Sequence, residues 1–170
     1  MWKNPGCMLT DKDFDILRQM LGRCSDDEPM GQLLREKIGA ARVVGCEEMP
    51  DDVVTLNSRV TYRLGNGEPE TRIISIDWTS WPGGPLLPIT TLRGLALLGL
   101  SKGQVFILSR DDNVLDMLHL LEVNYQPESA RRKMSTETRP RLRLVHGGRP
   151  DAIVRRKPVP EPDDPGPSAA

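Results

Sequence analysis

The spacing of the apolar residues changes once along the chain, and this change constrains the fold more than any other feature. Up to about residue 42 they recur at every third or fourth position, for example at Phe14, Leu17 and Leu21. That period is typical of helices with one buried face. From residue 53 the period becomes two, as at Val60 and Tyr62, which is typical of half-buried strands. The sequence therefore predicts helices followed by a sheet, an α+β fold.

Two helices are predicted in the first part of the chain, over about residues 10–21 and 30–42. Thr10 offers a hydroxyl that caps the first of them, and acidic residues follow it at the positive end of the helix. Gly22 and the polar run 25–29 separate the two helices. Each has about 12 residues and is roughly 18 Å long. We therefore expect a short antiparallel hairpin that needs other elements to stabilise it.

Strands and one further helix are predicted in the second part of the chain. The strands cover residues 59–64, 71–77, 104–108 and a long stretch from the turn at 111–113 to Tyr125. On the long strand, strict alternation predicts that one face is shared by Met117, His119, Leu121, Val123 and Tyr125. Residues 92–100 are rich in Leu and Ala and predict a short buried helix. The expected domain is an antiparallel sheet with one helix.

Residues 128–170 differ in composition from the rest of the 170-residue chain. They hold ten Lys or Arg and six Asp or Glu, a net charge of +4, whereas residues 1–127 have a net charge of −5. Prolines recur between residues 158 and 167, and apolar residues are too few to offset the entropy of folding. We predict a disordered, Pro-rich basic tail. A solvated tail without a partner is the default interpretation. As alternatives, the basic triplets 131–133 and 155–157 predict at most weak, nonspecific contact with RNA or DNA, and the alternating segment 141–145 is a candidate strand on a partner.

Composition excludes several classes of function. The net charge of −1 disfavours a general nucleic-acid binder. Cys7, Cys24 and Cys46 form no CxxC pair, so we expect no disulfide framework, metal site or cofactor, and a location in the reducing cytoplasm. No apolar run reaches the ~18 residues that span a bilayer, and residues 1–7 lack the apolar stretch of a signal peptide. We therefore expect no membrane contact.

Three separated motifs carry a resemblance to a known family. They are residues 48–60 (EMPDDVVTLNSRV), residues 96–100 (ALLGL) followed by Gly103, and residues 121–127 (LEVNYQP). In this order and spacing they resemble the C-terminal domain of the Gre family of transcription factors, and most closely its short paralogues, the regulators of nucleoside diphosphate kinase. The resemblance covers about residues 8 to 130. It implies a helical hairpin, or coiled coil, over 8–44, a domain like the FK506-binding prolyl isomerases over 48–128, and a disordered tail over 129–170.

The resemblance also implies a partner and a function. Gre-like factors bind RNA polymerase at its secondary channel, and the matching contact segment here is Thr90, Thr91, Leu92 and Arg93. We therefore expect a monomeric, non-enzymatic transcription regulator that competes with Gre factors and affects nucleoside diphosphate kinase only indirectly. The alternative is a Gre-type factor that stimulates transcript cleavage through an acidic hairpin tip, at Asp26, Asp27 and Glu28. Such carboxylates help to position Mg²⁺, but helices of only ~18 Å would stop short of the catalytic centre. A solvated turn, whose acids favour the N-terminus of the second helix, is the simpler explanation.

Other candidate residues have simpler explanations beside the functional ones. Trp78 and Trp81 lie in a proline-flanked loop that would anchor an interface or cap the sheet. A prolyl isomerase or chaperone domain would require a pocket formed by Tyr62, Phe106 and Tyr125. His119 lies inside a strand without the partners of a catalytic triad. Cys46 has acidic neighbours that disfavour the thiolate.

Overall fold

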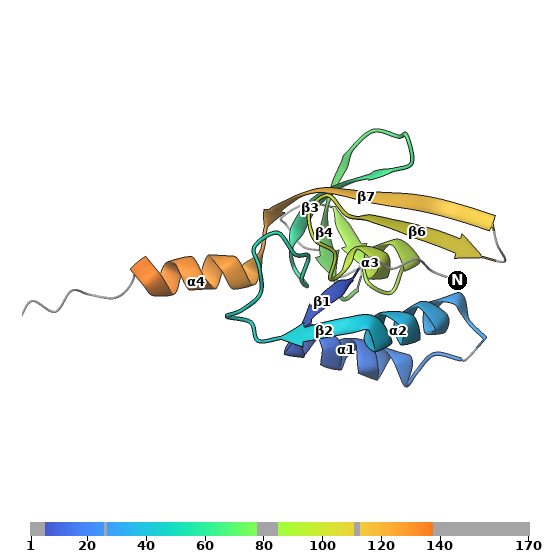
Figure 1. The fold of residues 1–170 in the computed structure, drawn as a ribbon, viewed down its shortest axis with the longest axis horizontal. Helices are drawn as coiled ribbons and strands as arrows, with labels where there is room; N and C mark the ends of the chain where they lie inside the picture. Colours follow the sequence, from blue (N-terminus) through green and yellow to red (C-terminus); the bar gives the residue numbers. More distant parts are fainter. Residues whose placement is uncertain (1–5, 26, 78–84, 111–112, 138–170) are drawn as a thin grey trace, which may run out of the picture. The chain divides into compact units, whose positions relative to one another are not determined.

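Four helices and seven strands in two sheets make up the part of the chain that the computed structural model describes, residues 6–25, 27–77, 85–110 and 113–137 (Figure 1). The mixed α+β class predicted from the sequence is confirmed. In chain order the elements are β1 (Cys7–Thr10), α1 (Asp11–Leu21), α2 (Pro29–Ala40), β2 (Ala41–Val44), β3 (Arg59–Leu64), β4 (Glu70–Ser75), β5 (Leu86–Pro88), α3 (Leu92–Leu97), β6 (Val105–Arg110), β7 (Asn113–Tyr125) and α4 (Pro127–Glu137).

The larger sheet has five strands in the order β5-β4-β3-β7-β6. The pairs β3–β4, β3–β7 and β6–β7 are antiparallel, as the sequence predicts, whereas the short strand β5 runs parallel to β4. One face of the sheet buries Val60, Tyr62 and Ile74 in a core that also contains α3. The opposite face, which we call the outer face, carries the alternate residues of β3, among them the exposed Arg59.

Strand β7 does not keep the strict alternation that the sequence predicts. Its pairing with β3 shifts register twice, so that Val60 pairs with Val123 whereas the next residue back, Arg59, pairs with Tyr125. Each such bulge adds one residue to β7 and reverses the faces beyond it. The prediction that Met117, His119, Leu121, Val123 and Tyr125 share one face is therefore wrong. Among residues 116–125, the part of this strand whose burial is described, Leu118 and Leu120 are fully buried.

Strands β1 and β2 form a second, parallel sheet that the sequence analysis did not predict. A parallel pair requires a long crossover connection, and here α1 and α2 provide it. The amide of Met8 donates to the carbonyl of Gly99 at 3.0 Å, which ties β1 to the turn after α3. This sheet therefore joins the helix pair to the rest of the fold.

Helices α1 and α2 are close to the bounds that the sequence predicts, and they contact each other. The hydroxyl of Thr10 caps α1 by accepting from the amide of Asp13 at 3.0 Å. Pro29 begins α2, where its missing N–H costs nothing. Figure 1 shows α3 between this helix pair and strands β6 and β7. None of the helices in the described ranges has the length and apolar character needed to cross a bilayer.

Helix α4 corrects the prediction of a disordered segment that starts at residue 129. The helix continues to Glu137 and is held by polar contacts with the loop before β3. The side-chain amide of Gln126 donates to the carbonyls of Pro50 and Val53, at 2.7 Å each, and Arg132 donates to the carbonyl of Cys46 at 3.0 Å. The rest of the predicted tail, residues 138–170, lies outside the described residues.

Candidate functional site

The segment predicted to contact a partner, Thr90 to Arg93, forms the start of α3. Thr91 is the N-cap, and its hydroxyl accepts from the amide of Gly94 at 3.1 Å and donates to the carbonyl of Pro88 at 2.7 Å. Leu92 packs partly against the core. Thr90 and Arg93 are exposed. The structure thus divides the segment into two residues that build the fold, Thr91 and Leu92, and two that face solvent.

Arg93 is held in place by an ion pair with β7. Its Nε lies 2.9 Å from Oδ2 of Asp116, while 47% of the Arg93 side chain stays exposed. An exposed pair of this kind contributes little to stability. Its main effect is to fix the direction of the guanidinium, which leaves part of its surface for a partner. We call Thr90 and Arg93 the α3 surface.

The acidic turn lies on a separate element, between α1 and α2. Asp27 and Glu28 are exposed, and Asp26 lies outside the described residues. Glu28 is the N-cap of α2 but its side chain makes no capping hydrogen bond. In the described ranges no group of three or more His, Cys, Asp or Glu could hold a metal ion. The helices that carry the turn have 11 and 12 residues, so they are only about 16–18 Å long.

A buried lysine joins the helix pair to α3, and the sequence analysis missed it. Lys37 of α2 is 0% exposed, and its Nζ donates to the carbonyl of Ala96 at 2.9 Å and lies 5.3 Å from the centre of the Phe106 ring. Burial lowers the pKa of Lys37, and burial likewise raises the pKa of the neighbouring Cys7 thiol. A signal was present, because Lys37 follows Leu33 and Leu34 at the spacing of the buried stripe.

Asp13 forms a second buried polar contact, between α1 and the loop before β3. Its Oδ2 accepts from the amide of Leu56 at 3.3 Å. Burial raises the pKa of Asp13 to about 6; the Leu56 hydrogen bond opposes this shift and the nearby Glu128 adds to it. Glu128 itself accepts from the Thr55 hydroxyl at 2.6 Å, so α1 and α4 meet the same loop. Together with Lys37, these contacts attach the helix pair firmly to the sheet domain.

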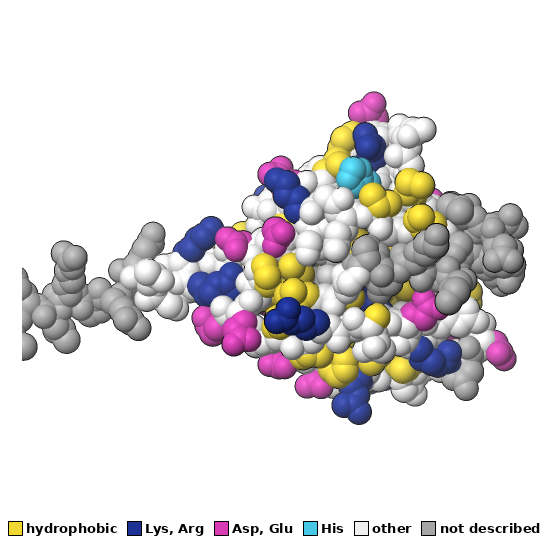
Figure 2. All heavy atoms as spheres, in the orientation of Figure 1, with side chains coloured by type: hydrophobic (Ala, Val, Ile, Leu, Met, Phe, Trp, Pro, Cys, Tyr) yellow, Lys and Arg dark blue, Asp and Glu magenta, His cyan; other side chains and the backbone are white. Residues whose placement is uncertain are grey.

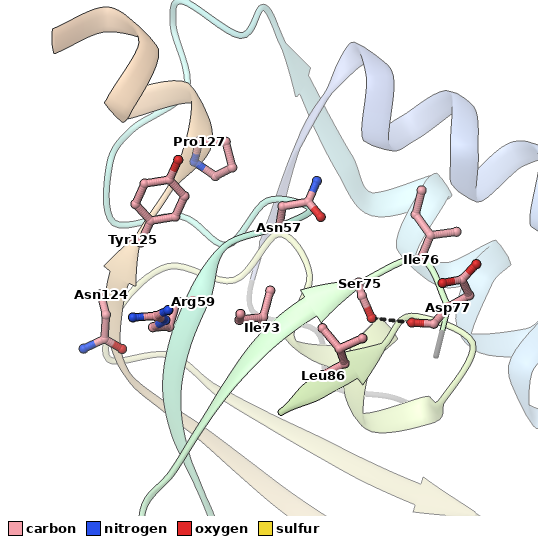
Figure 3. Close-up of a pocket in the computed structure, with 10 residues that line it drawn as sticks. All are labelled: Asn57, Arg59, Ile73, Ser75, Ile76, Asp77, Leu86, Asn124, Tyr125 and Pro127. Carbon is pink, nitrogen blue, oxygen red and sulfur yellow. Dashed lines mark hydrogen bonds between the residues drawn. The ribbon is translucent and has the colours of Figure 1, made fainter. Parts of the chain in front are cut away.

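A pocket of about 800 Å³ opens on the outer face of the sheet, and neither Thr90 nor Arg93 lines it (Figure 3). Four of its lining residues lie side by side across the sheet as cross-strand partners: Leu86 on β5, Ile73 on β4, Arg59 on β3 and Tyr125 on β7. Among the residues that the structure describes, the lining is Asn57, Arg59, Ile73, Ser75, Ile76, Asp77, Leu86, Asn124, Tyr125 and Pro127. Of the predicted aromatic set only Tyr125 is here, since Tyr62 and Phe106 are buried in the core. The aromatic pocket that an isomerase would require is therefore not formed by these three residues.

His119 and Cys46 have structural environments without evident chemistry. His119 is half-buried, and its Nδ1 lies 3.5 Å from Nη2 of Arg63. The carbonyl of Cys46 accepts the hydrogen bond from Arg132. Trp78 and Trp81 lie outside the described residues. Figure 2 shows basic and acidic side chains interspersed on the face in view, with hydrophobic side chains between them.

Known proteins are similar to this chain in sequence and in fold, although no protein-family model matches it. The regulators of nucleoside diphosphate kinase from Escherichia coli K12 and from Shigella flexneri are each 36% identical to it over 103 residues, which is 60% of this chain and 76% of the relative. Among solved structures, a prokaryotic transcription elongation factor GreA/GreB from Nitrosomonas europaea is similar, with a TM-score of 0.55 and 28% identity over 72% of this chain and 100% of that one. The chain belongs to the family of regulators of nucleoside diphosphate kinase, which here has the fold of a Gre-type factor.

Proposed function

We propose that this protein is a non-catalytic transcription regulator that binds RNA polymerase at the entrance of the secondary channel and competes there with Gre factors. Membership of the family and the likeness to a Gre-type elongation factor support the class of function. The observation that carries the competitive mechanism is the length of α1 and α2, 11 and 12 residues. Helices of about 16–18 Å would occupy the entrance of a channel without spanning a long path inside it.

The α3 surface is the proposed contact with the polymerase. Thr90 and Arg93 are exposed at the start of a short helix whose cap and core contacts hold it rigidly. Arginine is enriched at interfaces because its planar guanidinium contributes both packing and directed hydrogen bonds. The pair with Asp116 fixes that group before binding, which lowers the entropy cost of association.

The direct test is a competition experiment with purified components. A stalled elongation complex that contains backtracked RNA is mixed with a Gre factor, and the rate of transcript cleavage is measured as this protein is added. We expect the cleavage rate to fall to that of the polymerase alone. The concentration of this protein that halves the rate should rise as more Gre factor is present. Cleavage that stays constant at saturating protein, or protein that does not bind the polymerase, would refute the proposal.

The acidic turn favours a second candidate, a cleavage-stimulating factor. Asp27 and Glu28 are exposed at the end of the helix pair, where Gre-type factors carry their acidic tip. The same elongation complex, without any Gre factor, separates the two functions. An increase in cleavage that disappears in the variant with Asp26, Asp27 and Glu28 all changed to Ala would favour this candidate, and no increase would favour competition.

Three finer features belong to the proposal. We propose that the helix pair acts as a short hairpin or coiled coil, and that the sheet domain is related to the prolyl isomerase-like domain of Gre factors. We propose a monomer, which light scattering of the purified chain would test. The effect on nucleoside diphosphate kinase is proposed to be indirect, through transcription, so the purified kinase should keep its activity when this protein is added.

A further inference from the structure

A patch on the outer face of the sheet combines one cationic side chain with apolar ones. Arg63 of β3 pairs with His119 of β7, and His119 pairs with Val105 of β6, so the three form a row across three strands. The next row contains Ile107 and Met117, which are also cross-strand partners. All of them face away from the core, because the residues that alternate with them on β6 and β7 are buried. We call these five residues the Arg63 patch; in Figure 2, the histidine drawn in cyan lies on the visible face beside basic and hydrophobic side chains.

Arg63 has no acidic partner among the residues that the structure describes. Its Nη2 lies 3.5 Å from Nδ1 of His119, which is a long contact with an imidazole and not an ion pair. Its Nε is buried and has no hydrogen-bond acceptor in the same part of the chain. Glu122, further along β7, is paired with Lys102 at 3.7 Å. A buried donor without an acceptor costs free energy, so a carboxylate that reaches this guanidinium from outside would gain a strong, charge-assisted contact.

The charges around the patch favour a single carboxylate over a polyanion. A nucleic-acid strand carries one negative charge per nucleotide and is bound by several cations along its path. The patch supplies one cation, Arg63, and residues 1–127 carry a net charge of −5. A protein segment with an isolated Glu or Asp side chain therefore matches the patch better than a nucleic acid does.

The apolar part of the patch lies at a distance from Arg63 that suits an extended peptide. Met117 is 45% exposed, and its partner Ile107 is half-buried on β6, an edge strand of the sheet. Side chains two positions apart in an extended chain point the same way and lie about 7 Å apart. From β3 to β6 the patch spans two strand spacings, about 10 Å, and the long Arg63 side chain covers the difference. A carboxylate at Arg63 thus places the side chain two positions along over Met117 and Ile107.

We propose that the Arg63 patch binds an extended segment of a partner protein in which a Glu or Asp lies two positions from an apolar side chain. The carboxylate pairs with the Arg63 guanidinium, which turns so that Nε and Nη2 both donate to it, and the apolar side chain packs on Met117 and Ile107. Arginine and methionine are both enriched at protein interfaces. The proposal goes beyond the polymerase contact and does not depend on it, since neither Thr90 nor Arg93 belongs to the patch.

The test uses NMR of the isotope-labelled full chain, because the Nε–H of an arginine gives a signal of its own. The signal of Arg63 is identified by its loss in Arg63→Lys. The probe is the capped peptide Ser-Leu-Ser-Glu-Ser-Val-Ser, which offers an apolar side chain two positions from its glutamate on either side. We expect the Arg63 signal to shift as the peptide saturates the protein. A peptide with glutamine in place of glutamate should bind about fivefold more weakly and leave the signal nearly unmoved.

Charge reversal gives a sharper test than the loss of a charge. Arg63→Glu should reverse the preference, so that a peptide with lysine in place of glutamate binds better than the original peptide. The matched control is Arg42→Glu, at an exposed arginine of β2, which should keep the preference of the wild type. Met117→Ala should weaken binding about threefold, whereas Val43→Ala, which removes an apolar side chain that is 38% exposed on β2, should change nothing.

The possible outcomes decide between a site and nonspecific contact. An Arg63 signal that stays in place up to the solubility limit of the peptide would overturn the proposal, as would equal shifts with the glutamate and glutamine peptides. A single-stranded RNA oligonucleotide that moves the signal more than the peptide does would overturn the choice of a protein partner. Because Arg63→Glu leaves the α3 surface intact, it should leave competition with Gre factors unchanged, so failure here and failure of the polymerase proposal are distinguishable.

Discussion

The two ends of α3 have opposite environments. Its first turn is capped by Thr91 and exposes Arg93, which pairs with β7 at the surface. Its last turn is buried, where the carbonyl of Ala96 accepts from Lys37 and the following turn at Gly99 contacts β1. Because α3 has only six residues and is about 9 Å long, the surface that would contact a partner and the junction with the helix pair form one rigid unit.

The comparison shows how different the expected effects of substitutions are over one short helix. Changes at the buried end should lower the free energy of unfolding, because they leave cavities or unpaired polar groups in the core. Changes at the exposed end should affect binding while stability hardly moves, because ion pairs at a surface contribute little. The following predictions test this contrast.

The largest loss is expected at Lys37. Lys37→Ala removes a fully buried side chain and leaves the carbonyl of Ala96 without this donor, so we expect unfolding to become easier by about 4 kcal/mol. Lys37→Met is the matched control, since it keeps most of the volume and removes the buried amino group, and should cost about 1 kcal/mol. Urea denaturation followed by circular dichroism measures both. Equal losses for the two variants would show that packing around Lys37 is unimportant.

Gly99 tests the same buried end through the backbone. Its φ of +79° is a left-handed conformation, and a Cβ there would lie 2.5 Å from Sγ of Cys7 and 2.9 Å from the carbonyl oxygen of Met8. Gly99→Ala should therefore cost about 3 kcal/mol, from backbone strain and overpacking together. Gly103→Ala is the control, because that glycine has a similar φ of +83° but open space around it. It should cost about 1 kcal/mol, and an equal loss would remove the steric part of the argument.

Asp13 sharpens the contrast through pH. Its pKa is about 6 in the folded chain and 3.8 ordinarily. Between these two pH values the Asp13 carboxyl is therefore mostly protonated in the folded chain and mostly ionised in the unfolded chain. The stabilising contribution of the protonated group is present below pH 4 and is lost as the pH rises through 6, a change of about 3 kcal/mol. Asp13→Asn keeps an acceptor for the Leu56 amide and should raise stability at pH 7.5 by about 2 kcal/mol. It should also flatten the profile between pH 4 and 7, whereas Asp11→Asn, at an exposed position, should not.

The sequence predicts the helices and the long strands well, because their apolar periods are set by burial on one side. Helices α1, α2 and α3 and strands β3, β4, β6 and β7 all lie within a few residues of the predicted ranges. The missed strands, β1, β2 and β5, have three or four residues, too few to show a period. Their pairing is also decided by partners far along the chain, as for Cys7 with Ala41.

The candidate site was less predictable, for a related reason. The periodic pattern indicates which face of an element is buried, but it does not show what a polar residue on that face contacts. Lys37 lies on the buried stripe of α2, yet its acceptor, the Ala96 carbonyl, is 59 residues away. The pocket on the outer face depends on the bulges that turn Tyr125 to the side of Arg59, and no sequence period shows a bulge.

The exposed end of α3 carries the smallest expected change in stability and the most direct test of the contrast. Arg93→Ala and Asp116→Ala should each lower the free energy of unfolding by less than about 1 kcal/mol, since their pair is partly exposed. Arg93→Ala should nonetheless weaken polymerase binding about tenfold if this residue is an interface anchor. Asp116→Ala keeps the guanidinium and removes only its support, so its effect on binding should be smaller.

A double-mutant cycle measures how much of this effect passes through the ion pair. In stability, the coupling energy between Arg93 and Asp116 should be about 0.5 kcal/mol. In binding, Asp116→Ala should weaken the affinity for the polymerase when Arg93 is present and should have no effect in the Arg93→Ala background. The control is Glu70→Ala, which breaks the Arg72–Glu70 ion pair on β4. The side chains of that pair are exposed to a similar degree, and the variant should leave polymerase binding unchanged. If Arg93→Ala and Glu70→Ala bind the polymerase equally well, the contact lies elsewhere, and the rigid connection through α3 would no longer explain how the helix pair is positioned.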